Sequence, residues 1–380
     1  MQKEMKSIQM VDLSTQYERI REEMDNAIGD VIRSGKYINS EVVREFAGEL
    51  SGYIGSRRVI PCANGTDALQ IALMSLHLQA GDEVIVPAFT YAATAEAIAL
   101  LKLRPVLVDV NPRTFNIDVD KIEDAISSAT KAIVPVHLFG QCCDMEPLML
   151  IARKYGLSVI EDNAQSIGSV YTFRDGTRKQ AGTIGDIGTL SFFPSKNLGA
   201  YGDGGALLTD DEGRAEKLRM IASHGQSRKY THDVIGCNSR LDAVQAAVLR
   251  VKLPYLDAYI RARAKAALEY DTQLKPLTDL LETPSCISSS THVYHQYTVK
   301  VKRNRDDFQS YLKENGIPSM IYYPLPLHHQ QAFKDIVKMG GDLSETERLC
   351  RSVLSIPMHT ELGEEQIRYI ISRIKSYEFD

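Results

Sequence analysis

The 380-residue sequence lacks the features that would place the chain in a membrane or direct it out of the cell. No uninterrupted apolar run approaches the roughly 18 residues that a membrane-spanning helix requires. The first residues, MQKEMKSIQMVDL, contain no apolar segment of the length found in signal peptides. On these grounds we expect a cytoplasmic protein.

An excess of basic residues is also missing, because 44 Lys and Arg stand against 49 Asp and Glu, for a formal net charge of −5. A general nucleic-acid binder is usually basic, so that class of protein loses support. None of the six cysteines forms a C-x-x-C pair, which argues against a zinc ribbon. We expect the cysteines to be free thiols, several of them buried. We also expect no metal site, because the adjacent His328 and His329 would face opposite sides of a strand.

Two nucleotide-binding signatures are absent as well. The chain has no G-x-x-x-x-G-K-[ST] motif, and GDGGAL (202–207) fails the G-x-G-x-x-G pattern, so a dinucleotide-binding fold has little support. There are no internal repeats and no low-complexity linker. The apolar fraction of 44% and the charged fraction of 24% are near the average of soluble globular proteins, and the length suggests two domains.

What the chain does contain, from residue 64 to about 210, is an alternation of helical patterns with short apolar runs. We predict helices at 64–78, 94–102 and 146–156, and strands at 82–88, 104–110, 131–139 and 157–162. The apolar runs are continuous, which is typical of strands buried on both faces of a largely parallel sheet. The alternation of strands with helices predicts a doubly wound α/β fold.

The pattern changes after about residue 240. Ser239 and Asp242 fit an S-x-x-D capping pattern at a helix start, and Pro254 should end or kink that helix. Further on, the pattern predicts a strand at 296–301 with one solvent-exposed face. It also predicts helices at 306–316 and 366–374. We therefore expect a large domain over residues 1–251 and a smaller α+β domain over residues 252–380.

Lys196 stands in a segment rich in small residues, SFFPSKNLGAYGDGGALLT (191–209). A lysine is usually a solvated surface charge, but Phe192, Phe193 and Pro194 directly precede this one. The small residues after it would let a ligand approach the backbone closely. A desolvated lysine has a lowered pKa and becomes a nucleophile toward aldehydes, so the segment suggests a reactive lysine without deciding for one.

Two further elements extend this pattern. Asp162 ends an apolar strand, and ligands bind at such strand ends in open α/β sheets. A role as the cap of a following helix is an equal alternative for Asp162. Because Glu161 and Asp162 are adjacent, only one of them can face a site. Asn64, Gly65 and Thr66 open a helix whose free N–H groups suit a phosphate, although a plain cap is the simpler interpretation on local grounds. A phosphate seat, an acid and a lysine are together what a pyridoxal phosphate enzyme needs.

Seven segments together resemble motifs of the DegT/DnrJ/EryC1/StrS family of sugar aminotransferases, and the resemblance covers nearly the whole chain. They are CANGTDALQ, VPAFTYAATAEA, PVHLFGQ, IEDNAQSIG, SFFPSKNLGAYGDGGA, GCNSRLDAVQAA and YYPLPLH. The resemblance implies an α/β, aspartate aminotransferase-like fold (fold type I) with a mostly parallel sheet in the large domain, and pyridoxal 5'-phosphate as the cofactor. One loop departs from the family, because the chain reads YINSEVV (37–43) where members often read Y-I-x-G-P.

The resemblance also implies roles for individual residues. Lys196 would bind the cofactor as a Schiff base and shuttle the proton, and Asp162 would pair with the ring nitrogen. The other cofactor contacts would come from Gly65, Thr66, Tyr91, Gln165, Ser191 and, from the neighbouring subunit of a homodimer, Asn238. The alternative for Tyr91 is a buried tyrosine in an apolar cluster.

Members of the family make amino sugars on nucleotide carriers, with glutamate as the usual amino donor, so the resemblance implies these two partners. The charge balance and the lack of a long apolar run argue against nucleic acid and a membrane as further partners. GCNSRLD is most similar to members that aminate the C3 position of UDP-2-acetamido-2-deoxy-3-oxo-glucuronate, for surface polysaccharide or amino-sugar biosynthesis. The alternatives are a dTDP-3-keto-6-deoxyhexose, a C4-keto sugar, or a regulator that binds pyridoxal phosphate without turnover. The expected substrate contacts are Arg240, His224, Arg228, Tyr322 and Tyr323, and a solvated charged loop is the alternative for the cations.

Overall fold

The computed structural model describes residues 7–378. Its helices are α1 (Leu13–Arg19), α2 (Arg21–Ser34), α3 (Glu41–Ile54), α4 (Gly65–Met74), α5 (Ala93–Leu100), α6 (Ile122–Ala125), α7 (Met145–Tyr155), α8 (Glu212–Ala222), α9 (Ala243–Lys252), α10 (Leu256–Leu274), α11 (Arg305–Glu314), α12 (Ser344–Ser352) and α13 (Glu364–Lys375). Short 3₁₀ turns are η1 (Val119–Lys121), η2 (Leu138–Gly140), η3 (Leu253–Tyr255) and η4 (Leu327–His329). None of the helices in this part of the chain has the length and apolar character needed to cross a bilayer.

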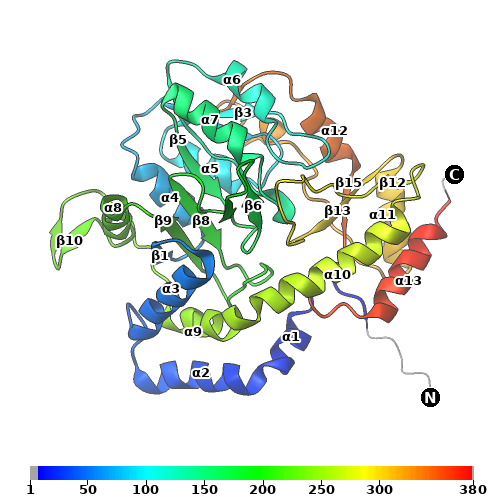
Figure 1. Cartoon of the computed structure of the whole chain (residues 1–380), viewed down its shortest axis with the longest axis horizontal. Coiled ribbons are helices and arrows are strands. Elements are labelled where there is room, and N and C mark those ends of the chain that lie inside the picture. Colours follow the sequence, from blue (N-terminus) through cyan, green and yellow to red (C-terminus); the bar gives the residue numbers. More distant parts are fainter. Residues whose placement is uncertain (1–6, 379–380) are drawn as a thin grey trace.

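The strands form one large sheet and three small ones. They are β1 (Arg58–Cys62), β2 (Glu83–Pro87), β3 (Arg104–Val108), β4 (Thr130–Ile133), β5 (Ser158–Asp162), β6 (Val170–Thr172), β7 (Arg178–Gln180), β8 (Ile187–Ser191), β9 (Gly205–Thr209), β10 (Gln226–Arg228), β11 (Thr231–His232), β12 (Leu281–Glu282), β13 (Tyr297–Val301), β14 (Lys338–Met339) and β15 (Val353–Ile356). The large sheet has eight strands in the order β1-β9-β8-β5-β4-β2-β3-β14 (Figure 1). Only β9 runs against its neighbours β1 and β8, so the predicted, mostly parallel sheet is confirmed.

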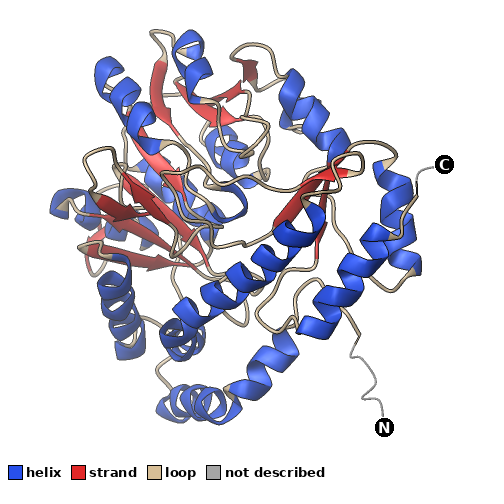
Figure 2. Cartoon of the chain, turned by 45° about the vertical axis from the view of Figure 1, so that its right-hand side comes forward, coloured by secondary structure: helices blue, strands red, loops and turns tan. Residues whose placement is uncertain are grey.

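Helices cover both faces of this sheet (Figure 2). Val84 and Val86 of β2 belong to the core cluster that contains α4 and α5, whereas Ile85 belongs to the cluster that contains α7. Adjacent residues of a strand point to opposite faces, so β2 is buried on both sides. The expected doubly wound architecture is therefore present, and it places the carboxyl ends of β5 and β8 side by side.

A three-stranded antiparallel sheet, β12-β13-β15, lies apart from the large sheet, and α10 runs from α9 toward it (Figure 1). The predicted helix near the C-terminus is α13. Its apolar stripe is buried against this smaller sheet, as expected, and consists of Ile367, Ile370, Ile371 and Ile374.

Strand β13 differs from its prediction, because all five of its residues are buried. The expectation of one wet face was wrong. The polar side chains of β13 are satisfied inside the protein, where Thr298 Oγ1 lies 2.8 Å from Ser355 Oγ and Lys300 Nζ donates a hydrogen bond of 2.9 Å to the Pro112 carbonyl. The alternation of polar and apolar residues in this strand therefore does not indicate that one of its faces is exposed to solvent.

The turn into α9 corrects a second expectation. Asp242 precedes α9 but accepts no capping hydrogen bond, and the Ser239 hydroxyl accepts a bond of 3.0 Å from the Ala63 N–H instead. The predicted S-x-x-D cap is therefore wrong. Pro254 does end the helix, since α9 stops at Lys252 and η3 follows.

The C-terminal segment contributes to both parts of the molecule. Strand β14 pairs in parallel with β3 at the edge of the large sheet, while β13 and β15 build the small one. The division of the chain at residue 251 remains a prediction. All six cysteines are free thiols, as expected, and four are buried, namely Cys62, Cys142, Cys143 and Cys350.

Candidate active site

A cavity of about 570 Å³ opens where the carboxyl ends of β5 and β8 meet the start of α4. It brings together most of the predicted site residues, namely Gly65, Thr66, Tyr91, Asp162, Gln165, Ser191, Lys196, Tyr322 and Tyr323. Its volume lies within the roughly 300–1,000 Å³ of small-molecule sites. We refer to it as the active-site pocket.

Asp162 is the last residue of β5, and its side chain reaches this pocket although the residue is only 5% exposed. Its Oδ2 accepts a hydrogen bond of 2.8 Å from Thr94 Oγ1, and its Oδ1 accepts one of 3.1 Å from the Ala164 N–H. These two donors fix the orientation of the carboxylate. The helix-cap alternative is wrong, because the chain after Asp162 continues through turns to β6.

The neighbouring Glu161 points to the other side of β5 and has a structural role. Its carboxylate accepts hydrogen bonds of 2.6 Å from the N–H groups of Ile184 and Gly185, and it lies 2.8 Å from His137 Nε2. Burial alone would raise the pKa of Glu161, but these partners outweigh it and the pKa is lowered. Only one acid of the pair therefore serves the pocket, as the sequence predicted.

Lys196 lies in the loop between β8 and β9, and its side chain is half-buried and open to the pocket. Burial lowers the pKa of Lys196 to about 8, although the charge of Asp162 acts in the opposite direction. Within residues 7–378 the amine makes no hydrogen bond. A surface lysine is excluded by this position, and the amine is a nucleophile at mildly alkaline pH.

The loop that carries Lys196 is held by another lysine, Lys252, which is fully buried and was not predicted. Lys252 is 1% exposed, and its Nζ donates a hydrogen bond of 2.8 Å to the Gly199 carbonyl. The same amine lies 4.3 Å from the centre of the Tyr201 ring. Burial lowers the pKa of Lys252 to about 8 as well. Its place in an apolar helical pattern gave no sign of this contact.

The start of α4 supplies the pocket with backbone donors. Asn64 caps the helix by accepting a hydrogen bond of 2.8 Å from the Asp67 N–H, and no other part of the described chain accepts from the N–H groups of Gly65 and Thr66. A Cβ atom at Gly65 would lie 2.7 Å from the Ser191 Cβ, so glycine permits this close approach of α4 to β8. The cap and the anion seat are thus both present.

Aromatic side chains also line the pocket. Tyr91 is 61% exposed, which excludes the buried-cluster alternative, and its ring centre lies 6.1 Å from that of Tyr323. The Tyr323 hydroxyl accepts a hydrogen bond of 3.3 Å from Gln165 Nε2, while Gln165 Oε1 accepts one of 2.8 Å from the Phe139 N–H. Gln165 is therefore held in one orientation at the pocket.

His295 also lines the pocket and was not predicted. It is 6% exposed, and its Nδ1 is buried with no hydrogen-bond partner among residues 7–378. Burial and the positive charges of Lys196 and Arg263 hold the pKa of His295 well below its usual range, so the ring is a neutral imidazole. Its sequence context, HVYHQY, carries no local sign of a site, because tertiary packing alone brings it to Lys196.

Four predicted residues lie outside this pocket. Asn238 is exposed and pairs with Ser223 in an isolated β-bridge, and Arg240 lines a separate cavity. His224 and Arg228 are exposed at the β10–β11 hairpin, which projects from the body of the molecule (Figure 1). Their roles remain predictions.

His328 and His329 do not face opposite sides of a strand, so that expectation was wrong. They lie in the turn η4, where the Nε2 atoms of His328 and His329 approach Glu347 Oε1 to 3.3 and 3.7 Å. A 3₁₀ turn rotates successive side chains by much less than a strand does, which explains why both rings reach the same carboxylate.

Comparison with known proteins identifies the family. The sequence profile of the DegT/DnrJ/EryC1/StrS aminotransferase family matches residues 18–375. A pleiotropic regulatory protein of Geobacillus stearothermophilus is 45% identical over 98% of both chains. The UDP-2-acetamido-2-deoxy-3-oxo-D-glucuronate aminotransferase of Pseudomonas aeruginosa is 44% identical over 97% of this chain and 99% of the relative. A UDP-N-acetyl-3-dehydro-α-D-glucosamine 3-aminotransferase of Acidithiobacillus ferrooxidans is 43% identical over 97% of each chain.

Solved structures are similar along nearly the whole chain. A DegT/DnrJ/EryC1/StrS aminotransferase from Brucella abortus superposes with a TM-score of 0.92 at 41% identity, covering 97% of this chain and 98% of the other. The ntda protein of Bacillus subtilis, solved with the bound cofactor PMP, has a TM-score of 0.89 at 34% identity, covering 99% of this chain and 87% of the other. The aminotransferase fold implied by the sequence is thereby confirmed.

Proposed function

Because the chain belongs to the DegT/DnrJ/EryC1/StrS aminotransferase family, it is an aminotransferase, and we propose that it moves an amino group from glutamate to a 3-keto nucleotide sugar. The proposed acceptor is UDP-2-acetamido-2-deoxy-3-oxo-glucuronate, the substrate in the name of the Pseudomonas aeruginosa relative. The names of two of the similar proteins described above specify UDP-linked 3-keto sugars as substrates, and both support a reaction at C3.

The pocket fits pyridoxal 5'-phosphate, the cofactor we propose, at each of its parts. The free N–H groups of Gly65 and Thr66, with Ser191 beside them, form an anion seat at the start of α4. The exposed ring of Tyr91 offers a flat apolar face for an aromatic ring. In the same pocket, Asp162 presents an oriented carboxylate, and Lys196 presents an amine that makes no hydrogen bond within residues 7–378.

When bound, pyridoxal phosphate supplies an electron sink that stabilises negative charge on the carbon beside the amino nitrogen. Asp162 would hold a proton on the ring nitrogen, since Thr94 and Ala164 fix the direction of its carboxylate. Lys196 would hold the cofactor and then move a proton at the reacting carbon. A pKa of about 8 leaves its amine able to accept and return a proton near neutral pH.

We further propose that the protein is a homodimer in which each active site contains residues of both subunits. We also propose that it acts in the cytoplasm. Asn238 and Arg240 lie outside the pocket of their own chain, whereas the family resemblance assigns Asn238 to the phosphate of a neighbouring subunit. Residues of one copy would then complete the pocket of the other across a two-fold axis. Tyr322 and Tyr323 line the pocket of their own copy and would contact the sugar there.

The observation that carries the proposal is that Lys196 and Asp162 face one pocket with an anion seat. The test is to incubate the purified holoenzyme with glutamate and a panel of UDP- and dTDP-linked keto sugars, and to locate the new nitrogen by NMR of the product. We expect 2-oxoglutarate and a C3 amine on the UDP sugar. A C4 amine or a preference for the dTDP sugar would contradict the acceptor, and absence of any reaction with glutamate would favour a regulator.

A further inference from the structure

Two histidines and a glutamate converge at one point outside the active-site pocket. His328 Nε2 and His329 Nε2 lie 3.3 and 3.7 Å from Glu347 Oε1, and the three atoms all lie within 4.8 Å of one another. Among residues 7–378, this is the one place where three His, Cys, Asp or Glu side chains bring ligand atoms so close. We call it the His–His–Glu cluster. None of the roles that the family resemblance implies falls on it.

The arrangement of the cluster suits a metal ion. The reason to expect no metal site is that adjacent residues of a strand face opposite sides, but the turn η4 brings both rings to one carboxylate. Imidazole nitrogens and carboxylate oxygens bind zinc at about 2.0–2.2 Å, which places neighbouring ligand atoms of a tetrahedral site about 3.4 Å apart. The distances of 3.3 and 3.7 Å to Glu347 Oε1 are close to this spacing.

Both sides of the cluster stand on backbone that the fold holds in place. The His329 N–H donates a hydrogen bond of 3.0 Å to the Pro326 carbonyl, which closes the turn η4. On α12, Thr346 donates from its N–H and its Oγ1 to Asp109 Oδ1, at 2.8 and 2.7 Å. These bonds fix the turn and the start of α12, so the ligands need little rearrangement to bind an ion.

The ring of His328 can offer the nitrogen that a metal requires. Its side chain is 7% exposed, and its Nδ1 is buried with no hydrogen-bond partner among residues 7–378. Because no donor holds Nδ1 as an acceptor, the proton of the neutral ring can reside there and leave the Nε2 lone pair free. The side chains of His329 and Glu347 are 51% and 36% exposed, so an ion can enter from solvent.

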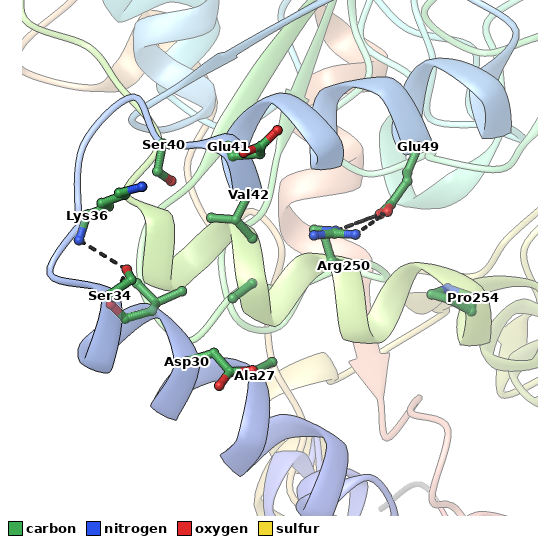
Figure 3. Close-up of a pocket in the computed structure, with 12 residues that line it drawn as sticks. Ala27, Asp30, Ser34, Lys36, Ser40, Glu41, Val42, Glu49, Arg250 and Pro254 are labelled. Carbon is green, nitrogen blue, oxygen red and sulfur yellow. Dashed lines mark hydrogen bonds and ion pairs between the residues drawn. The ribbon is translucent and has the colours of Figure 1, made fainter.

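The carboxylate of the cluster is also available, which is not true of every acid beside a cavity. Between α2, α3 and α9, Glu49 binds Arg250 through both of its oxygens, at 3.0 and 3.1 Å from Arg250 Nε (Figure 3). Glu347 Oε1 instead faces the two histidines, while Arg351 Nη1 approaches the other oxygen, Oε2, to 3.8 Å. Arg351 is 71% exposed, and an ion pair so exposed contributes little that a metal ion would have to replace.

We propose that the His–His–Glu cluster binds one zinc ion, with water in the fourth position. The ion would link η4 to α12. Leu349 of α12 belongs to the apolar cluster against which Tyr322 and Tyr323 pack, so the bound ion would also stiffen the support of these two pocket residues. This site goes beyond the proposed reaction and does not depend on it.

The test is zinc binding by the holoenzyme, prepared without a histidine tag and titrated in competition with a chromophoric chelator. We expect one zinc ion per chain. His329→Gln and Glu347→Gln should each weaken its binding at least about tenfold, because loss of a group that merely supports a ligand already costs about 10–100-fold. The matched controls are Glu345→Gln, an acid of the same helix paired with Arg348 at 2.7 Å, and His232→Gln, an exposed histidine of β11. Both should bind zinc as the wild type does.

Zinc should also raise the melting temperature of the wild type, because an ion that binds the folded chain stabilises it. This rise should be absent in His329→Gln and Glu347→Gln, whose melting temperatures without zinc report any misfolding separately. Equal zinc affinity in the wild type and these two variants would overturn the proposal, and so would an equal loss in the controls. Failure of the wild type to bind zinc at micromolar concentrations would overturn it as well.

Discussion

Thr94 Oγ1 donates a hydrogen bond of 2.8 Å to Asp162 Oδ2, so that a hydroxyl on the first turn of α5 orients the acid at the end of β5. Both residues are buried, at 2% and 5% exposure. Water therefore cannot replace this donor easily. The orientation of the proposed partner of the ring nitrogen thus depends on a residue from a different element.

Thr94→Val should lower the rate of the half-reaction with glutamate by about ten- to a hundredfold, because a hydrogen bond to a buried charged group is worth roughly 1.5–3 kcal/mol. Thr94→Ser keeps the hydroxyl and should retain most of the rate. Stopped-flow absorbance of the bound cofactor measures both variants. Equal rates for the valine and serine variants would show that Thr94 does not orient Asp162.

Lys196→Ala should abolish transamination, because no other lysine lines the active-site pocket in the described part of the chain. Borohydride reduction of the wild-type holoenzyme, followed by peptide mass spectrometry, should place the cofactor on Lys196. Lys252 is the informative competitor, since its pKa is also lowered to about 8 by burial. A label on Lys252 would refute the assignment.

The lowered pKa of Lys196 predicts a pH dependence in the cofactor-free protein. The pKa of Lys196 in the folded protein, about 8, lies below the ordinary lysine value of 10.5. The unfolded chain therefore binds more protons between these two pH values, and the free energy of unfolding should rise with pH there. The free energy of unfolding should rise by about 3 kcal/mol over this range, because each unit of pKa difference corresponds to about 1.4 kcal/mol. Denaturant titrations of wild type and Lys196→Met at pH 7 to 10.5 measure it as a difference, and parallel curves would contradict the prediction.

Shared active sites predict complementation between inactive subunits. Lys196→Ala lacks the amine, and Asn238→Ala lacks the side chain proposed to reach the partner's pocket. Mixed dimers should regain activity, because one of their two pockets would contain both intact residues. Steady-state rates of refolded mixtures test this. A fully active monomer in sedimentation experiments would rule out the shared site.

If the sugar is a uronate, Arg240 should contribute more than charge. Arg240→Leu should impair the sugar half-reaction strongly, and Arg240→Lys should impair it nearly as much, because lysine keeps the charge but loses the two-pronged donor geometry. The half-reaction with glutamate serves as the internal reference for each variant. Full activity of the lysine variant would indicate that charge alone is recognised.

Local patterns predicted four of the eight strands of the large sheet, namely β2, β3, β4 and β5, but not β1, β8, β9 or β14. A strand end and a run of small residues made Asp162 and Lys196 candidates, and the family resemblance assigned their roles. Thr94, Lys252 and His295 were not predicted, because their contacts join residues distant in the chain. Where a prediction from local sequence was wrong, tertiary contacts determined the structure instead. The Ser239 hydroxyl pairs with Ala63 rather than capping α9, and the polar residues of β13 find partners inside the protein.

Strand β14 has a consequence for any shortened form of the protein. Its two residues, Lys338 and Met339, pair with Val106 and Leu107 and cover the outer edge of β3. A chain that ended before them would leave β3 as an open edge, whose unpaired backbone groups are a template for strands of other molecules. Residues far along the chain thus protect the large sheet from self-association. The large sheet should aggregate when produced without them, even though it retains every residue assigned to the cofactor.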